Sequence, residues 1–180
     1  LNRVTEASRR LLGLIGEILD LSRIDAGRLE MRPEAFQMAS FVRTFESPTT
    51  RGGAKSVEIV GDLGSAYTDR RRLHKCVMSV IACLRDLAPQ APIMLKATRF
   101  DQVLRFEITA EGVTLSPDML ASAQRFVGAH GSLSRAAGGS LALAVAQRLL
   151  ALLGGGLEAR NSMLGAMFVL RRWVQVDVDL

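Results

Sequence analysis

The side chains that could do chemistry in this chain are few and widely separated. His74 and His130 are its two histidines, and Cys76 and Cys83 are its two cysteines. The cysteines are seven residues apart, about 10 Å along a helix at ~1.5 Å per residue, which is too far for a disulfide. With so few histidines and no CxxC pair, we expect no structural zinc site. The cysteine usage favours a reducing, cytoplasmic environment.

Nucleophilic and acid–base catalysis find little support in the sequence. No GxSxG motif occurs and the serines fall in polar, loop-like stretches, so a Ser/His/Asp arrangement is not predicted. The carboxylates Glu17, Asp20 and Asp25 fit the solvent-facing side of a helix better than an acid–base pair. Cys83 could act as a redox-responsive thiol, although a buried helical cysteine is the commoner case. We therefore predict no catalytic residue and no metal ligand.

Length, composition and charge narrow the class of protein. The chain has 180 residues, of which 48% are hydrophobic, 23% charged and 5% aromatic, as expected for one globular domain with an aliphatic core and a short helical appendage. No uncharged apolar run approaches the ~18 residues of a membrane span, and no signal peptide is recognisable. The formal charge of +5 is scattered rather than clustered. We expect neither nucleic acid nor a membrane as a partner, and we interpret the chain, which begins at Leu1, as a segment of a longer protein.

The first thirty residues carry the clearest periodic pattern. Apolar residues recur at alternating spacings of three and four, which predicts a helix with one apolar face: Val4, Ala7, Leu11, Leu14, Ile18 and Leu21. Such a face must pack on other helices, and a helical hairpin that dimerises into a four-helix bundle would cover it. A helix that lies on its own domain is the alternative.

The remaining chain alternates between strand-like and helix-like patterns. Thr68 or Asp69 is predicted to cap a long helix that ends at Leu87, before Ala88-Pro89. A hairpin is expected around Phe100-Asp101. Shorter elements follow by the same logic, with strands over 34–38, 57–60, 157–160 and 166–176, helices over 39–45, 117–126 and 140–153, turns at 61–62 and 64–65, and loops over 47–53 and 127–139. Mostly antiparallel strands with helices on one face indicate an α+β fold, a two-layer α/β sandwich with a mostly antiparallel mixed sheet.

Three stretches resemble the sensor histidine kinase family. Residues 10–36 are similar to the family's second dimerisation helix and its exit, with DLSRIDAGRLEM at 20–31 close to a family phrase such as DLSKIEAGKLEL. Residues 68–88 resemble the asparagine-box helix, and 138–170 resemble the second glycine box with its helix and two closing strands. The resemblance implies a dimerisation helix over 1–32, followed over 33–180 by an ATP-binding sandwich of the Bergerat (GHKL) type.

The resemblance is weakest where the family binds Mg-ATP on its long helix. The asparagine that coordinates Mg²⁺ falls on Cys83, the first asparagine of the same phrase on Ser79, and a basic residue that approaches the phosphates on Asp86. A thiol is a poor ligand for a hard, oxygen-seeking ion. A carboxylate at 86 would repel a triphosphate.

The two glycine boxes depart from the family in the same way. The aspartate that accepts a hydrogen bond from adenine falls on Ala110, while Gly112 is retained. In the second box Gly138 is kept and Gly139 follows it, but Ser140 and Ala142 stand where the family has glycines. Those glycines let backbone N–H groups approach phosphate, and added Cβ atoms obstruct that approach.

Together these replacements predict weak or absent nucleotide binding and no cofactor. Each lost charge-assisted contact costs about 1.5–3 kcal/mol, so two or three would turn a micromolar site into a roughly millimolar one. The leading interpretation is a kinase-like phosphorelay module without ATP chemistry, a pseudokinase. It would act as a homodimeric platform for a response-regulator receiver domain, or as a phosphotransferase like the degenerate kinase-like ones of some bacteria.

Partner contacts and alternatives complete the prediction. Neither His74 nor His130 matches the phosphoacceptor, which the family carries on a helix preceding this one. Receiver domains dock on the helical bundle in this family, so the candidate contacts are exposed residues of the first helix: Arg9, Arg10, Glu17 and Arg23. One alternative is an active autokinase that holds Mg-ATP at the positions above. The other is a protein-interaction domain outside phosphosignalling.

Overall fold

The computed structural model describes residues 15–16, 18–47, 53–125 and 141–173. Its contacts divide the chain into two compact units, Leu1–Met31 and Arg32–Leu180. Among the described residues no helix is both long enough and apolar enough to cross a membrane.

The described part of the first unit is helical, as the periodic pattern predicts. The helix includes residues 15–16 and 18–25 and ends in a Schellman motif, in which the Arg28 amide donates to the Arg23 carbonyl at 2.9 Å and the Gly27 amide to the Ile24 carbonyl at 3.0 Å. Gly27 has φ +64°, a left-handed conformation that glycine adopts without strain. The phrase Ala26-Gly27 therefore fixes where this helix stops.

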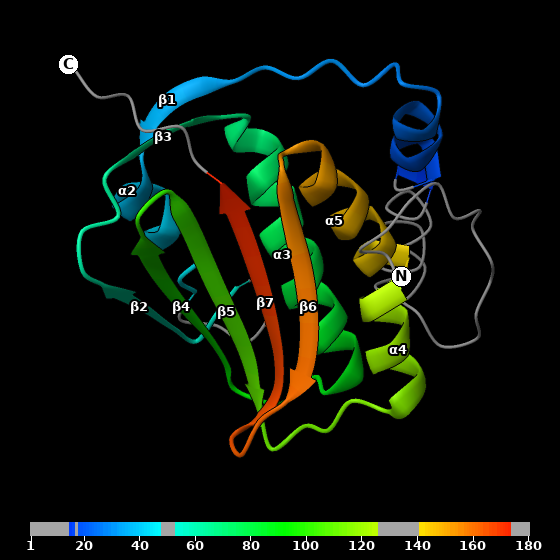
Figure 1. Cartoon of the computed structure of the whole chain (residues 1–180). Helices are drawn as coiled ribbons and strands as arrows, with labels where there is room; N and C mark the ends of the chain where they lie inside the picture. The colour runs from blue at the N-terminus through cyan, green and yellow to red at the C-terminus, as the bar shows by residue number, and fades with distance from the viewer. Residues whose placement is uncertain (1–14, 17, 48–52, 126–140, 174–180) are drawn as a thin grey trace, which may run out of the picture. The chain divides into compact units, whose positions relative to one another are not determined.

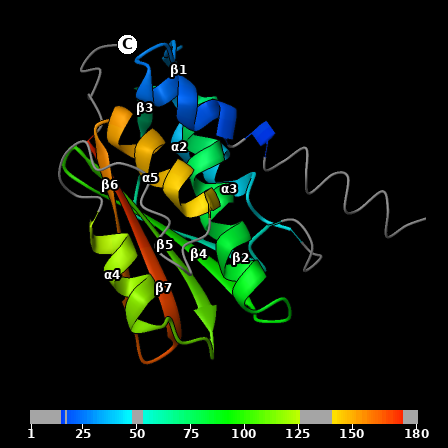
Figure 2. The ribbon, with the colours of Figure 1, turned by 90° about the vertical axis from the view of Figure 1, so that its right-hand side faces the viewer.

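The second unit is a two-layer sandwich built on a five-stranded sheet (Figures 1 and 2). Its strands lie in the order β2 (Ser56–Val60), β4 (Ile93–Phe100), β5 (Val103–Glu111), β7 (Gly165–Trp173) and β6 (Gly155–Asn161). Only the β2–β4 pair is parallel among these neighbours. The predicted α+β sandwich with a mostly antiparallel mixed sheet is confirmed.

Helices α3 (Arg70–Leu87) and α5 (Leu141–Leu152) pack on each other and cover one face of this sheet, and α4 (Pro117–Arg125) lies against β6 (Figure 2). The alternation along β5 explains the two faces. Leu104, Phe106, Ile108 and Ala110 are each at most 1% exposed, whereas Val103, Arg105 and Glu107 are only half-buried. Side chains alternate between the faces of a strand, so the even-numbered positions form the core and the odd-numbered ones line an open face.

A second, two-stranded sheet pairs β1 (Glu34–Gln37) with β3 (Ser65–Thr68) in antiparallel register, beside the short helix α2 (Met38–Arg43). The strand β3 is a correction, because Gly64-Ser65 predicted only a turn. Gly64 does turn, with φ +58°, but the four residues after Gly64 extend and pair with β1. A second correction concerns β6, which begins at Gly155, two residues before the strand expected over 157–160.

Candidate functional site

The long helix α3 positions three of the predicted site residues. Asp69 caps it, since its carboxylate Oδ1 accepts a hydrogen bond from the Arg72 amide at 3.0 Å. Ser79 and Cys83 follow one turn apart and are 8% and 1% exposed, so both belong to the packed side of the helix. Asp86, near its C-terminal end, is exposed. Asp86 is therefore on the solvent-exposed side of the helix, whereas Ser79 and Cys83 are on its packed side.

The end of β5 positions two more of the predicted site residues, Ala110 and Gly112. Ala110 is 0% exposed and pairs across the sheet with Ile93 on β4 and Ala166 on β7. Its methyl group is on the buried, even-numbered face, while the neighbouring Glu111 is exposed. Gly112 then turns the chain with φ +70°, and its amide donates to the Leu164 carbonyl at 2.9 Å.

These two segments lie at the same end of the domain (Figure 1). Five residues connect the end of α3 to the start of β4, and the Pro92 carbonyl in this connection accepts a hydrogen bond from the Glu111 amide at 3.1 Å. The end of α3 is thereby held next to the end of β5. The structure brings Cys83 and Asp86 to the same edge of the domain as Ala110 and Gly112.

The start of α5 points toward this same edge. α5 ends at Leu152, shortly before β6 begins at Gly155, whose partner Arg172 is at the other end of β7 from Ala166. The helix therefore runs away from the edge that contains Ala110. Gly138 and Gly139, just before this helix, are outside the described residues, as is His130. Ala142, where the family has a glycine, is 9% exposed on the buried side.

Asn161 is a positioning residue of this edge that sequence reasoning missed. Its side chain forms two hydrogen bonds with the backbone of Leu115, which is 46 residues away in the chain: the Leu115 amide donates to Oδ1 at 2.8 Å, and Nδ2 donates to the Leu115 carbonyl at 3.1 Å. The side-chain amide of Asn161 thus pairs with Leu115 as the backbone of a neighbouring strand would. It fixes the loop that leads from Gly112 into α4, which Ser116 then caps through the Met119 amide.

A close backbone approach completes the edge. Gly165 has φ +147°, and a Cβ placed on it would collide with the carbonyl group of Ala110. Glycine is therefore required where β7 begins beside the end of β5. The sequence offers only the Gly in the turn as a signal of this approach.

The donor chemistry of the edge does not fit a magnesium nucleotide. Ser79, Cys83 and Ala110 offer a hydroxyl, a thiol and a methyl group, all of them buried. Mg²⁺ prefers carboxylate and amide oxygens, and no group of three or more His, Cys, Asp or Glu side chains in the described part of the chain could hold a metal ion. Ala110 likewise has no carboxylate that could accept a hydrogen bond from an adenine amino group.

Burial and packing contacts surround two titratable side chains of α3, Cys76 and His74. Burial raises the pKa of the Cys76 thiol to about 12, and its Sγ donates to the Ala146 carbonyl on α5 at 3.7 Å. His74 stacks on Phe45 with 4.9 Å between ring centroids, and burial, followed by the charge of Arg70, lowers its imidazole pKa. Both cysteines are buried, and neither forms a disulfide. His74 is half-buried.

Of the four candidate receiver contacts, the structure describes Arg23, which is exposed near the end of the first helix. Arg9, Arg10 and Glu17 lie outside the described residues. Arg23 also contributes its carbonyl to the Schellman motif that ends this helix.

Comparison with known proteins gives the family. No family model matches the chain. The histidine protein kinase DivJ of Caulobacter vibrioides is 31% identical over 171 residues, which cover 91% of this chain and 28% of DivJ. The sensor histidine kinase GacS of Pseudomonas protegens is 32% identical over 170 residues, which cover 86% of this chain and 18% of GacS. The chain thus spans less than a third of the length of these relatives.

Solved structures agree on the fold. The histidine kinase AdeS of Acinetobacter baumannii matches with a TM-score of 0.71 at 17% identity, covering 97% of this chain and 84% of that one. Full-length ShkA in complex with AMPPNP matches with a TM-score of 0.71 at 22% identity, covering 95% of this chain and 37% of that one. The histidine kinase ThkA in complex with the response regulator TrrA matches with a TM-score of 0.69 at 15% identity, covering 97% and 50%.

These matches confirm the resemblance seen in the sequence. They extend over both the first helix and the sandwich, since they cover about nine tenths of the chain or more. The chain is therefore a homologue of the sensor histidine kinases of two-component systems, and its fold is that of the histidine-kinase (GHKL) ATPase domain.

Proposed function

We propose that this chain is a two-component signalling module whose nucleotide chemistry is weak or lost. The observation that carries the proposal is the buried set at the edge formed by α3 and β5, where Ser79, Cys83 and Ala110 supply neither a magnesium ligand nor an adenine acceptor. In such a module the sandwich keeps its shape through packing rather than through a bound nucleotide.

The two units would have different roles. Residues 1–32 form the second helix of a dimerisation hairpin and 33–180 form the kinase-like domain; the separation of contacts between Met31 and Arg32 supports this division. Two copies would associate through the first helix. Its exposed polar side, with Arg23 and the sequence candidates Arg9, Arg10 and Glu17, would receive the receiver domain of a response regulator.

A receiver partner is supported by one structural relative, the complex of ThkA with TrrA. If the parent protein supplies a histidine on a preceding helix, the module would also pass phosphoryl groups between that histidine and a receiver aspartate. In that case the kinase-like domain would stabilise the dimer and would take no part in the transfer.

The second candidate function is an active histidine autokinase. The names of DivJ and GacS and the AMPPNP complex of ShkA favour it. Under this reading Mg-ATP would lie between α3, the turn at Gly112 and the residues Gly138-Gly139. A protein-interaction domain outside phosphosignalling is the remaining alternative, and a pulldown with receiver domains separates it from the other two.

Restoring the missing groups tests the proposal. We expect the double variant Cys83→Asn with Ala110→Asp to bind Mg-ATP at least tenfold more tightly than the original chain, because it regains an oxygen ligand for Mg²⁺ and an acceptor for adenine. Calorimetric titration measures this difference. Cys83→Leu with Ala110→Leu is the matched control, since leucine is about the size of asparagine and aspartate but has no oxygen atom in its side chain. Equal affinity of the restored variant and its control would contradict the proposed loss at these positions.

A further inference from the structure

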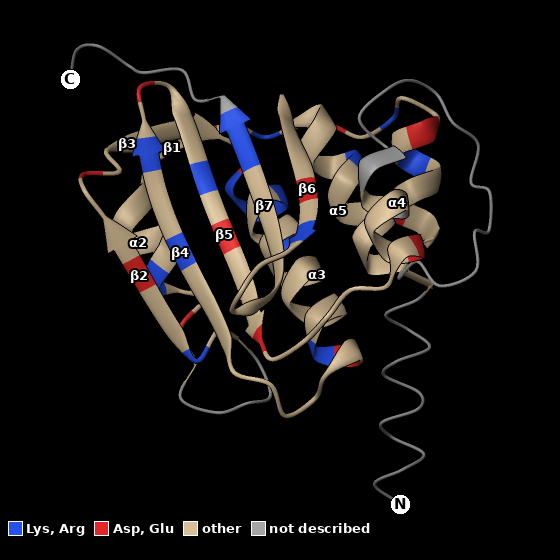
Figure 3. Ribbon diagram, turned by 60° about the horizontal axis from the view of Figure 1, so that its bottom comes forward, with Lys and Arg blue, Asp and Glu red and all other residues tan. Residues whose placement is uncertain are grey.

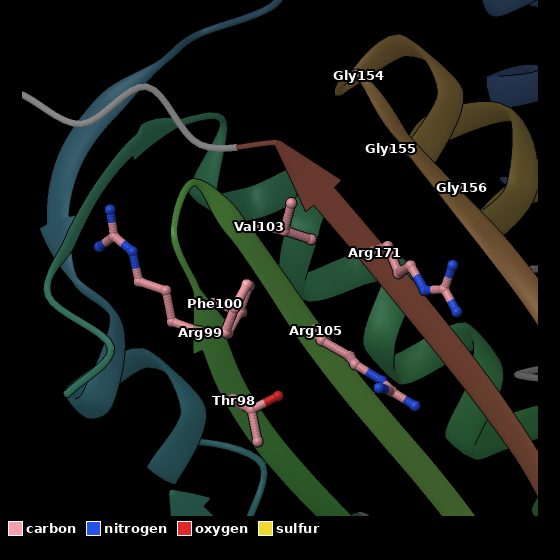
Figure 4. Close-up of a pocket in the computed structure, with 9 residues that line it drawn as sticks. All are labelled: Thr98, Arg99, Phe100, Val103, Arg105, Gly154, Gly155, Gly156 and Arg171. Atoms are coloured by element: carbon pink, nitrogen blue, oxygen red, sulfur yellow. The ribbon is translucent and has the colours of Figure 1, made fainter. Parts of the chain in front are cut away.

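A groove lies on the open face of the sheet, away from the α3–α5 layer and from the edge described above (Figure 4). Figure 3 shows this face of the sheet, with the Lys and Arg positions of its strands in blue. Its volume is about 790 Å³. The β4–β5 hairpin forms one side, β7 crosses the floor, and the start of β6 forms the other side. We define the open-face groove by four of its lining residues: Phe100, Arg105, Gly156 and Arg171.

The floor of the open-face groove is cationic. Arg105 on β5 and Arg171 on β7 are directly opposite each other in the strand register, an arrangement that destabilises a sheet unless counter-charges are present. Each arginine is paired with a glutamate on the same face: Arg105 with Glu107, and Arg171 with Glu158 at 3.1 Å. No acidic side chain lines the groove itself among the described residues.

These arginines keep N–H groups available for another acceptor. A guanidinium has five N–H donors, and the ion pairs with Glu107 and Glu158 engage one terminal nitrogen of Arg105 and one of Arg171. The guanidinium of a third lining residue, Arg99, points away from Arg105 and Arg171 (Figure 4) and is held by the carbonyls of Leu63 and Asp101. The cationic floor is therefore formed by Arg105 and Arg171.

The glycine at position 156 has no structural reason to be a glycine. Gly154 turns the chain with φ +72°, and a Cβ on Gly155 would collide with the Arg171 carbonyl. A Cβ on Gly156 would meet nothing within 4 Å, and its φ is not in the left-handed region. Glycine weakens the interior of a strand, and a strand glycine often marks the close approach of a ligand or another backbone. Here it leaves space beside its cross-strand partner Arg171.

The rim of the groove is apolar and exposed. Phe100 is 81% exposed at the tip of the β4–β5 hairpin, and Val103 opposite it is half-buried. Val60 on β2 is also an exposed large hydrophobic residue, and it is next to Thr98 of the groove in the register. Exposed aromatic residues beside arginines are the side chains enriched where proteins bind partners.

We propose that the open-face groove binds an acidic segment of a partner protein. Carboxylates of the segment accept hydrogen bonds from Arg105 and Arg171, an arrangement in which arginine is particularly effective. One apolar side chain of the segment packs on Phe100. The segment passes over Gly156, where a larger residue would block it. The site is on the face of the sheet opposite the α3–α5 layer, which carries the nucleotide-type positions, so it is independent of ATP binding.

The test uses two peptides of equal length. The probe is N-acetylated Asp-Glu-Phe-Glu-Asp amide and its neutral counterpart is N-acetylated Asn-Gln-Phe-Gln-Asn amide, each titrated into ¹⁵N-labelled full chain at low salt. We expect the acidic peptide to give saturable shifts at the amides of Val103, Arg105, Gly156 and Arg171, with an affinity that falls as salt is added. Equal binding of the neutral peptide would overturn the proposal.

Variants of the chain make the test specific. Gly156→Val places its side chain in the open space of the groove, so the variant should fold as well as the original chain, which thermal unfolding checks. It should bind the acidic peptide at least tenfold more weakly. Arg105→Gln with Arg171→Gln should lose binding to a similar degree. Lys96→Gln, on the same face beside Glu58 but outside the groove, should change affinity less than twofold. Unchanged binding by Gly156→Val, or displacement of the peptide by an equal concentration of inorganic phosphate, would contradict a segment-binding groove.

Discussion

The carboxylate of Asp69 joins the backbone of Arg32, the first residue of the second unit, to the beginning of α3. Its Oδ2 accepts a hydrogen bond from the Arg32 amide at 2.9 Å while its Oδ1 caps the helix through the Arg72 amide. Asp69 is only 5% exposed, and the Arg72 side chain approaches Oδ2 to 3.7 Å. One side chain therefore sets both where the long helix starts and where the chain enters the sandwich.

Replacing Asp69 should loosen both connections. We expect Asp69→Ala to lower the free energy of unfolding by about 2–3 kcal/mol, the sum of a lost helix cap and an amide left without its acceptor. Asp69→Asn should cost roughly half of that, because a single amide oxygen can serve only one of the two donors. Urea denaturation gives the free energies, and hydrogen exchange at the Arg32 amide reports the second connection.

Asp62→Ala is the matched control for these variants. Asp62 also accepts a hydrogen bond from a nearby amide, that of Gly64 at 2.8 Å, but it does so on the exposed surface. Its loss should cost no more than about 0.5 kcal/mol. If Asp69→Ala were no more harmful than Asp62→Ala, the double role of Asp69 would be refuted.

The packing of His74 predicts a stability that depends on pH. Burial and the charge of Arg70 lower its pKa from the ordinary value of 6.5, so protonation is easier in the unfolded chain than in the folded one. The stabilising contribution is complete above pH 6.5 and is lost as the pH falls through that value toward the lowered pKa of the folded state. Compared with the original chain, His74→Phe should lose less stability between pH 7.5 and pH 5.

Thermal unfolding at a series of pH values measures this effect. Carboxylates titrate near the lower end of the range, but they contribute equally to the original chain and to His74→Phe, which retains a ring to stack on Phe45. Parallel stability curves for the two proteins would show that His74 is not the responsible group.

The close approach of β7 to β5 predicts contrasting effects of one added methyl group. Gly165→Ala should destabilise the domain by at least ~2 kcal/mol, since its Cβ would collide with the Ala110 carbonyl group in a backbone conformation that favours glycine. Gly156→Ala, in open space on the neighbouring strand, should be neutral or stabilise by up to about 1 kcal/mol. Chemical denaturation of the two variants, side by side, checks the prediction, and equal losses would contradict it.

The contact between Asn161 and Leu115 predicts a local effect at the edge of the sheet. Asn161→Asp keeps the acceptor Oδ1 but removes the donor that faces the Leu115 carbonyl, so a carboxylate oxygen would oppose a carbonyl oxygen. We expect a loss of about 1–3 kcal/mol, together with faster hydrogen exchange from Gly112 to Met119. Exchange measured by NMR tests this, and slow exchange there in the variant would exclude the bridging role.

The elements predicted well from sequence are those fixed by local signals. Asp69 and Ala88-Pro89 bound α3 within a residue because a cap and a proline act on their immediate neighbours. The signals for the helix expected over 117–126 and for the hairpin around Phe100-Asp101 are equally local: α4 begins at Pro117, and Asp101 turns the chain with φ +50°. The strand β3 could not be foreseen in this way, because its four residues extend only through pairing with β1, about thirty positions earlier.

The features of the candidate site divide in the same way, into those with a local sequence signal and those that depend on long-range contacts. The replacements at Cys83 and Ala110 were visible in the sequence, because each falls in a phrase with a family counterpart. The Asn161–Leu115 contact and the approach of Gly165 to Ala110 were not visible, since each joins segments 46 and 55 positions apart through the register of the sheet. Long-range pairing decides these contacts, and no local pattern encodes it.

Calorimetric titration of the original chain with ATP in the presence of Mg²⁺ tests the central claim most directly. Lacking a hard ligand at Cys83 and an acceptor at Ala110, the chain should bind no more tightly than about 1 mM. A dissociation constant of roughly tens of micromolar or below, with one nucleotide per chain, would contradict this account and favour an active kinase.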